Sequence, residues 1–204
     1  LTAIKGIVEV LLRKPRTAEK YEEKMREVLV QTNRLSQLHD QLLQLAQLES
    51  SVLLAKKEKV FIEAIIQKSI KSYDTLIKNN NIQIHNSIPT DVIVWTDTLL
   101  LEMILDNLLS NAIKYNNKEG TIFFTWNAST KTLSVTDEGI GIDADQLPLL
   151  FNRFYRADES RSSHIPGNGL GLSITKRLCD SQNIILSVSS LKSKGSTFQL
   201  QFPT

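Results

Sequence analysis

The chain has 204 residues, 41% hydrophobic and 23% charged, which is typical of a globular protein with one large or two modest domains. Its 24 basic and 22 acidic residues nearly cancel to a formal charge of +2, which gives no support to a nucleic-acid or membrane-surface role. The single cysteine, Cys179, excludes an internal disulfide framework and a cysteine-rich zinc site, and no apolar run approaches the roughly 20 residues of a membrane span.

The first part of the chain is predicted to be a helical hairpin. Residues 1–12 have helical apolar spacing, residues 14–17 interrupt it, and Thr17 is a plausible start for a second helix to about Ala55. Two apolar series recur there at intervals of seven, namely Val28, Leu35 and Leu42, and Leu38, Leu45 and Val52. Such heptads predict that the hairpin pairs with a second copy as a four-helix bundle. The alternative is a hairpin packed on its own globular domain.

The heptads end at the charged segment 56–59, which places a predicted domain boundary between residues 57 and 58. In residues 58–204 we expect strands at 60–62, 82–84, 92–94, 121–128, 131–136, 184–189 and 197–202. Helices are expected at 63–77, 97–115, 145–151 and 170–179. The second domain is therefore predicted to mix helices and strands.

A strand that ends in an acid and two glycines is the first motif that points to a ligand. Residues 132–136 alternate apolar and polar side chains, which puts Asp137 on the inward face. Gly139 and Gly141 follow, and glycine lets the backbone approach a flat ligand. A buried carboxylate only accepts hydrogen bonds, so it suits a ligand that presents an amine, as a purine ring can. The alternative is a polar turn after a strand.

The predicted helix 97–115 carries the second motif. Asn107 and Asn111 are four residues apart, so they share one helix face. Asparagine is a poor helix former, and its amide oxygen suits Mg²⁺, whose remaining ligands are usually water and substrate phosphates. Lys114 and Tyr115 end on the same side and add a cation and a ring. The alternative is surface amides with a solvated lysine.

The third motif is a glycine cluster, Gly167-Asn168-Gly169-Leu170-Gly171-Leu172, that runs directly into a helix. Its backbone N–H groups and the helix dipole could hold an anion such as phosphate. It differs from a P-loop because no G-K-[ST] follows, and from a dinucleotide fingerprint because no strand leads into it. The polar loop before it contains Phe151, Phe154, Arg153, Arg156 and Arg161, and those arginines could close on phosphates. A capped loop-to-helix junction with solubilising arginines is the alternative.

Together these residues resemble a known family. Residues 107–115, 137–141, 151–156 and 167–172 look like the N, G1, F and G2 boxes of sensor histidine kinases of two-component systems, in the family's order and spacing. Residues 195–198 look like its last glycine-threonine motif. The resemblance implies an α+β protein: a dimerising helical hairpin at 1–57, and at 58–204 a two-layer α/β sandwich of the GHKL (Bergerat) type shared with gyrase, the Hsp90 chaperone and MutL.

The resemblance also implies an ATP site. Asp137 would accept a hydrogen bond from the adenine amine, and Gly139 and Gly141 would admit the ring. Asn111 would bind Mg²⁺, while Asn107, Lys114 and Arg156 would contact phosphates and act in catalysis. Tyr115 and Thr197 would border the adenine end of the nucleotide. The remaining expected nucleotide contacts are Phe154, Gly167, Gly169, Leu170, Gly171 and Leu172.

The implied activity is transfer of the ATP γ-phosphoryl group to a histidine of the dimerisation domain, for relay to the receiver domain of a response regulator. Leu1-Thr2 resembles the tail of the family's H-E-x-R-x-P-L-T acceptor box, so we expect the acceptor histidine to be missing. His39 is followed by Asp40 but by no Arg or Pro, and His85 and His164 also lack acceptor context. This segment should then bind ATP without phosphorylating itself, as a cytoplasmic part of a sensor that is anchored in the bacterial inner membrane.

Two other functions stay open. One is a nucleotide-binding dimerisation scaffold without kinase activity, which the heptads and the missing acceptor favour. The other is a GHKL-type ATPase. ATPases of that type place a Glu where Asn107 stands, so the sequence predicts negligible steady hydrolysis.

Overall fold

The computed structural model describes residues 2–49, 56–157 and 168–203, and the chain separates into two compact units, residues 1–47 and 48–204. The first unit consists of two helices, α1 (Thr2–Leu12) and α2 (Ala18–Glu49). The second unit mixes helices and strands, as predicted. The domain boundary between residues 57 and 58 stays a prediction.

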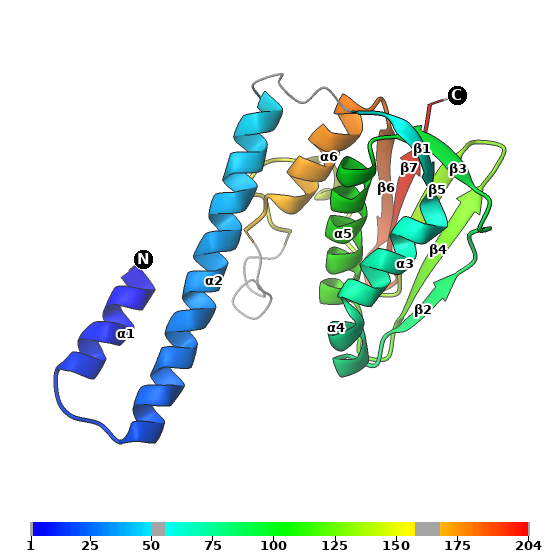
Figure 1. The fold of residues 1–204 in the computed structure, drawn as a ribbon. Coiled ribbons are helices and arrows are strands. Elements are labelled where there is room, and N and C mark those ends of the chain that lie inside the picture. Colours follow the sequence, from blue (N-terminus) through cyan, green and yellow to red (C-terminus); the bar gives the residue numbers. More distant parts are fainter. Residues whose placement is uncertain (1, 50–55, 158–167, 204) are drawn as a thin grey trace. The chain divides into compact units, whose positions relative to one another are not determined.

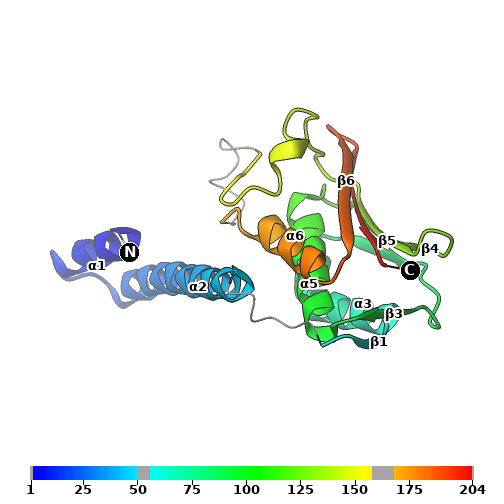
Figure 2. The ribbon, with the colours of Figure 1, turned by 90° about the horizontal axis from the view of Figure 1, so that it is seen from above.

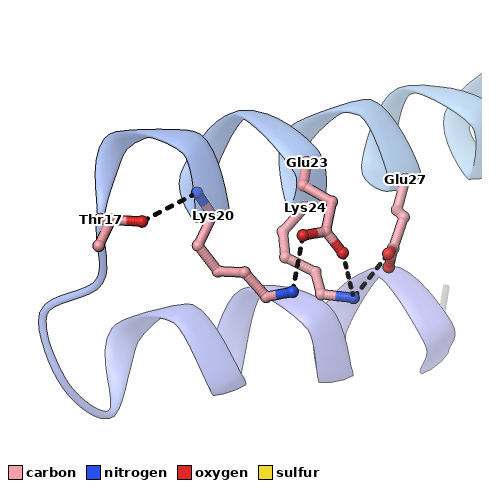
Figure 3. Close-up of polar contacts among 5 residues, drawn as sticks. All are labelled: Thr17, Lys20, Glu23, Lys24 and Glu27. Carbon is pink, nitrogen blue, oxygen red and sulfur yellow. Dashed lines mark hydrogen bonds and ion pairs between the residues drawn. The ribbon is translucent and has the colours of Figure 1, made fainter.

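Thr17 begins α2 as the sequence predicts. Its Oγ1 accepts a hydrogen bond from the Lys20 N–H at 3.4 Å, and its carbonyl accepts one from the Tyr21 N–H at 3.1 Å. Ion pairs follow along the first turns, with Lys20 on Glu23 and Lys24 on Glu27, each at 2.6 Å (Figure 3). Exposed pairs of this kind contribute only about 0.3–0.5 kcal/mol each, so packing of the apolar face must supply most of this unit's stability.

The second unit contains a five-stranded sheet in the order β2-β4-β5-β7-β6. Its strands are β2 (Gln83–Asn86), β4 (Thr121–Asn127), β5 (Thr132–Asp137), β6 (Ile185–Leu191) and β7 (Gly195–Gln201). Only β2 and β4 pair in parallel; the other neighbours are antiparallel. A separate antiparallel ribbon joins β1 (Glu58–Phe61) to β3 (Ile93–Thr96).

Helices form the second layer, on one face of the sheet. Helix α5 (Thr98–Tyr115) lies on β5, α6 (Gly171–Ser181) lies on β6, and α3 (Ile62–Ser72) lies beside α5 (Figures 1 and 2). The core forms between the layers, where Leu101, Leu105 and Leu108 of α5 are buried with Phe124, Leu133 and Leu200 of the sheet. The α+β fold with a two-layer sandwich is confirmed.

The helix predicted at 63–77 is in fact two helices, α3 and α4 (Asp74–Asn79), which meet at Tyr73. The half-buried Tyr73 hydrogen-bonds Ser110 of α5, and burial together with the Asp106 carboxylate raises the pKa of its phenol. The apolar periodicity runs across this break, so the sequence pattern does not reveal it. The helix predicted at 145–151 is likewise reduced to a single 3₁₀ turn, η1 (Leu147–Leu149). No helix in the described ranges is both long and apolar enough to cross a bilayer.

Candidate nucleotide site

Helix α5 presents the polar residues of the second motif on the side away from the core. Asp97 caps the helix, since its Oδ1 accepts a hydrogen bond from the Leu100 N–H at 3.1 Å. Asn107 and Asn111 are half-buried, whereas Leu108 and Ala112 beside them are buried. Two amides therefore stand one turn apart at the edge of the core.

Asp137 ends β5 with its side chain turned inward, as the alternation predicts. It is only 6% exposed, and its Oδ1 accepts a hydrogen bond from the Gly139 N–H at 2.9 Å. Burial raises the pKa of this carboxyl, and hydrogen bonds from the Gly139 and Ser196 backbone partly oppose the shift. A buried acid held by backbone N–H groups keeps acceptor capacity for a further donor.

The glycine segment after Asp137, residues 139–142, packs against the end of α5. The Ile140 N–H donates to the Tyr115 carbonyl at 3.0 Å. A Cβ on Gly139 would lie 2.9 Å from the carbonyl carbon of Tyr115 and 2.7 Å from Asp137 Oδ1, so no larger residue fits without a shift. The structure thus brings Asp137, Gly139 and Tyr115 together, although Tyr115 holds the segment through its backbone.

The glycine cluster at the start of α6 lies against Asn107 of α5. A Cβ on Gly171, the first residue of α6, would lie 3.1 Å from Asn107 Oδ1. Leu170 provides no side-chain cap for α6, so the N–H groups of the first turn are suited to a bound anion. Asn107 and an anion-binding helix end are therefore neighbours.

Some residues of the glycine cluster that are predicted to contact the nucleotide have buried side chains or lie outside the described residues. The side chain of Leu170 is fully buried, so a contact between this residue and a ligand would be made by its backbone, and its role in binding stays a prediction. Leu172 is half-buried. Gly167 lies outside the described residues, as do Arg161 and His164.

Phe154 is joined to the glycine cluster through backbone contacts. Its N–H donates to the Gly169 carbonyl at 2.9 Å, and both residues have positive φ, 62° and 69°. Phe154 is 63% exposed. A phenylalanine in the left-handed region carries local strain of about 1–3 kcal/mol, a feature that concentrates at ligand sites.

Lys114 and Arg156 bring two positive charges to the same place. Partial burial lowers the pKa of the Lys114 ammonium, and the nearby charge of Arg156 lowers it further. Each charge is less favourable in the presence of the other, so an anion between them would relieve their repulsion.

We expect Lys114→Met to raise the stability of the ligand-free protein and to reduce the stabilisation that a bound anion provides. Because the folded pKa of Lys114 is depressed, its charge destabilises the fold at pH values below that pKa, and the penalty disappears as pH rises above the unfolded value. At pH 7 the variant should melt slightly higher without ligand, yet gain less melting temperature from added pyrophosphate. Calorimetric scans with and without pyrophosphate measure both effects. Lys118→Met, an exposed control in the turn that follows α5, should change neither.

Thr197 is not the direct partner of Asp137 in the sheet, and its role at the adenine end stays a prediction. In the antiparallel pair of β5 and β7 it is opposite Thr136, and the two hydroxyls are 3.0 Å apart on the face of the sheet away from the helices. The residue opposite Asp137 is Ser196, which is buried on the helix-covered face. The period-two pattern of β7, with Phe198 and Leu200 inward, was the signal that could have identified Ser196.

Comparison with known proteins finds relatives over nearly the whole chain. A family model described as "Histidine kinase-, DNA gyrase B-, and HSP90-like ATPase" matches residues 96–204. The phosphate regulon sensor protein PhoR of Pseudomonas aeruginosa is 34% identical over 205 residues, which cover 99% of this chain and 46% of that protein. The sensor-like histidine kinase SenX3 of Mycobacterium tuberculosis is 30% identical over 199 residues, which cover 97% of this chain and 48% of that protein. The chain thus spans about half the length of these curated relatives.

Solved structures share the fold at lower identity. The histidine kinase AdeS of Acinetobacter baumannii superposes with a TM-score of 0.75 at 20% identity, over 100% of this chain and 95% of that one. Full-length ShkA in complex with AMPPNP superposes with a TM-score of 0.75 at 23% identity, over 99% of this chain and 43% of that one. The histidine kinase ThkA in complex with the response regulator protein TrrA superposes with a TM-score of 0.77 at 22% identity, over 99% of this chain and 57% of that one.

Proposed function

The chain belongs to the family of histidine kinase-, DNA gyrase B- and HSP90-like ATPases, and within it to the sensor histidine kinases; on this premise we propose that its second unit binds Mg-ATP for phosphoryl transfer to a histidine. The observation that carries the proposal is the buried Asp137 beside a glycine segment that excludes larger residues. A carboxylate in that setting can select a base that presents an amine.

The phosphates of the nucleotide would lie away from Asp137, near Lys114, Arg156 and the first turn of α6. Lys114 and Arg156 supply two mutually repelling cations, and the first turn of α6 supplies backbone N–H groups without a side-chain cap. Asn107, against Gly171, can donate its amide to a phosphate oxygen. Gly169 and Phe154 join this helix end to the segment that carries Arg156.

Magnesium fits the donor set. No group of three or more His, Cys, Asp or Glu suited to a metal occurs in residues 2–49, 56–157 and 168–203. A metal here would be held by the amide oxygen of Asn111 together with phosphate oxygens and water, which is how Mg²⁺ is commonly bound with nucleotides. Bound Mg²⁺ neutralises charge on the phosphates, and the chain's own residues orient the nucleotide.

The function needs a phosphate acceptor as well as a donor site. In the transfer, the bond between the γ-phosphorus and the ADP oxygen breaks, and a bond to an imidazole nitrogen forms. Positioning and charge neutralisation by Lys114 and Arg156 are the contributions expected from this chain. His39, His85 and His164 lack an acceptor context in the sequence, so we propose that residues 1–204 alone bind ATP without becoming phosphorylated.

The helical unit is the proposed dimer interface. Several apolar side chains of α1 and α2 are exposed in the single chain, among them Leu12, Met25, Leu29, Val30 and Leu35. A second copy would cover them and complete a four-helix bundle. Of the heptad residues, the side chains of Leu38, Leu42 and Leu45 and all of Val52 lie outside the described residues. The phosphohistidine would pass its phosphoryl group to the receiver domain of a response regulator on the cytoplasmic side.

Transfer from γ-labelled ATP tests the proposal. We expect label on a separately supplied helical domain that contains an acceptor histidine, none on residues 1–204 themselves, and negligible release of free phosphate. The label should survive base and be lost in acid. Label on residues 1–204 would contradict the proposal that they lack an acceptor. Nucleotide binding without any transfer would instead support a dimerisation scaffold, and rapid phosphate release an ATPase.

A further inference from the structure

Ser190 lies near the end of β6 and shares the helix-covered side of the sheet with Leu186. It is opposite Ser196 of β7, which is in turn opposite Asp137 of β5. Three polar side chains thus form one row across three strands, with the predicted base-selecting acid at one end and Ser190 at the other.

The Ser190 hydroxyl has a defined set of partners. It donates its single proton to the Gly195 carbonyl at 2.7 Å and accepts a hydrogen bond from the Ile142 N–H at 2.9 Å. Its third partner, Ser196 Oγ, is 3.0 Å away. Because the Ser190 proton is already used, Ser196 must be the donor in that pair. The Ser196 oxygen can then only accept further hydrogen bonds, and the ionised Asp137 carboxylate likewise only accepts them.

Ser190 also holds the glycine segment from the side opposite α5. Its bond to Ile142 lies next to a second bond, from the Ser193 N–H to the Ile140 carbonyl at 2.7 Å. Gly141, with φ of 64°, packs on the backbone of Leu191. The segment is therefore fixed between the end of α5 and the turn that joins β6 to β7.

We propose that Ser190 is a positioning residue for nucleotide selection. It fixes the glycine segment and orients the Ser196 proton so that the row beside Asp137 offers acceptors only. Such a row favours a purine with an amine at position 6 and disfavours one with a carbonyl there. The inference rests on the proposed function, because it concerns the base of the nucleotide that the site binds.

The test compares ATP with ITP, which replaces the amine by a carbonyl. In Ser190→Ala, the Ser196 hydroxyl can turn and donate to that carbonyl, while the Ile142 N–H loses its acceptor. We expect ATP affinity to fall about tenfold, ITP affinity to fall less, and the ATP-to-ITP affinity ratio to drop at least about threefold. Calorimetric titration measures all four affinities. Ser190→Thr keeps the hydroxyl and should restore the wild-type ratio.

Ser187→Ala removes a hydroxyl from an exposed position of the same strand and should leave the ratio unchanged. An equal loss for ATP and ITP in Ser190→Ala, or no loss, overturns the inference. Ser196→Ala provides a second route if Ser190→Ala does not fold: it removes the oriented acceptor, and an unchanged ratio in that variant also overturns the inference. Failure of the unmodified chain to bind ATP would instead reject the proposed function.

Discussion

Asp137→Asn is expected to weaken ATP binding by roughly 1–3 kcal/mol, about five- to 150-fold. One side-chain oxygen can keep the hydrogen bond from the Gly139 N–H, which is 2.9 Å from Oδ1 in the parent chain. The other oxygen becomes an NH₂ group, which would face the donating amine of the base. Isothermal titration with ATP and ADP measures the effect, and unchanged affinity would remove Asp137 from the site.

The same substitution should cost the fold little. The folded pKa of Asp137 is raised above its ordinary value of 3.8, chiefly by burial, so the ionised acid is less stable in the fold than in the unfolded chain. That penalty is absent below the unfolded pKa and complete above the folded pKa. The free energy of unfolding of the parent chain, relative to Asp137→Asn, should therefore fall as pH rises through this window.

Two controls separate these effects. Asp145→Asn alters an exposed acid a few residues further on and should leave ATP affinity unchanged. ATP affinity of the parent chain should weaken as pH falls through the raised pKa of Asp137, because the protonated acid has lost acceptor capacity. If Asp137→Asn binds normally but unfolds readily, Asp137 has a structural role only.

Gly139→Ala is expected to abolish measurable ATP binding and to destabilise the second unit by about 1–3 kcal/mol, the usual cost of forcing a methyl group into a packed site. The new Cβ would meet the carbonyl of Tyr115 and the carboxylate of Asp137, both held by the surrounding fold. The segment must then move, and the hydrogen bond from the Ile140 N–H to the Tyr115 carbonyl is strained.

Gly6→Ala is the matched control, because a Cβ there has open space in helix α1. It should leave ATP affinity unchanged and raise helix stability by about 0.5–1 kcal/mol. Chemical denaturation and titration of both variants give the comparison. Normal ATP binding by Gly139→Ala would show that the backbone near Gly139 does not approach the nucleotide.

Local patterns in the sequence were sufficient to predict several parts of this protein. The alternation in β5 placed Asp137 inward, and Thr17, at the end of the break at residues 14–17, located the start of α2. The order of four short motifs indicated the family, which the family model matching residues 96–204 then showed. These features depend on residues close in the chain, whose periodicity and hydrogen bonding are set locally.

Tertiary packing decided the rest, because it depends on contacts between residues far apart in the chain. The break between α3 and α4 occurs at Tyr73, which hydrogen-bonds Ser110 of α5, and the pairing of β7 with β5 puts Ser196 rather than Thr197 opposite Asp137. The repulsion between Lys114 and Arg156 and the row that ends at Ser190 also arise only after folding. The sequence by itself determined which chemical groups are available, and the register of strands distant in the chain determined which of them share one face.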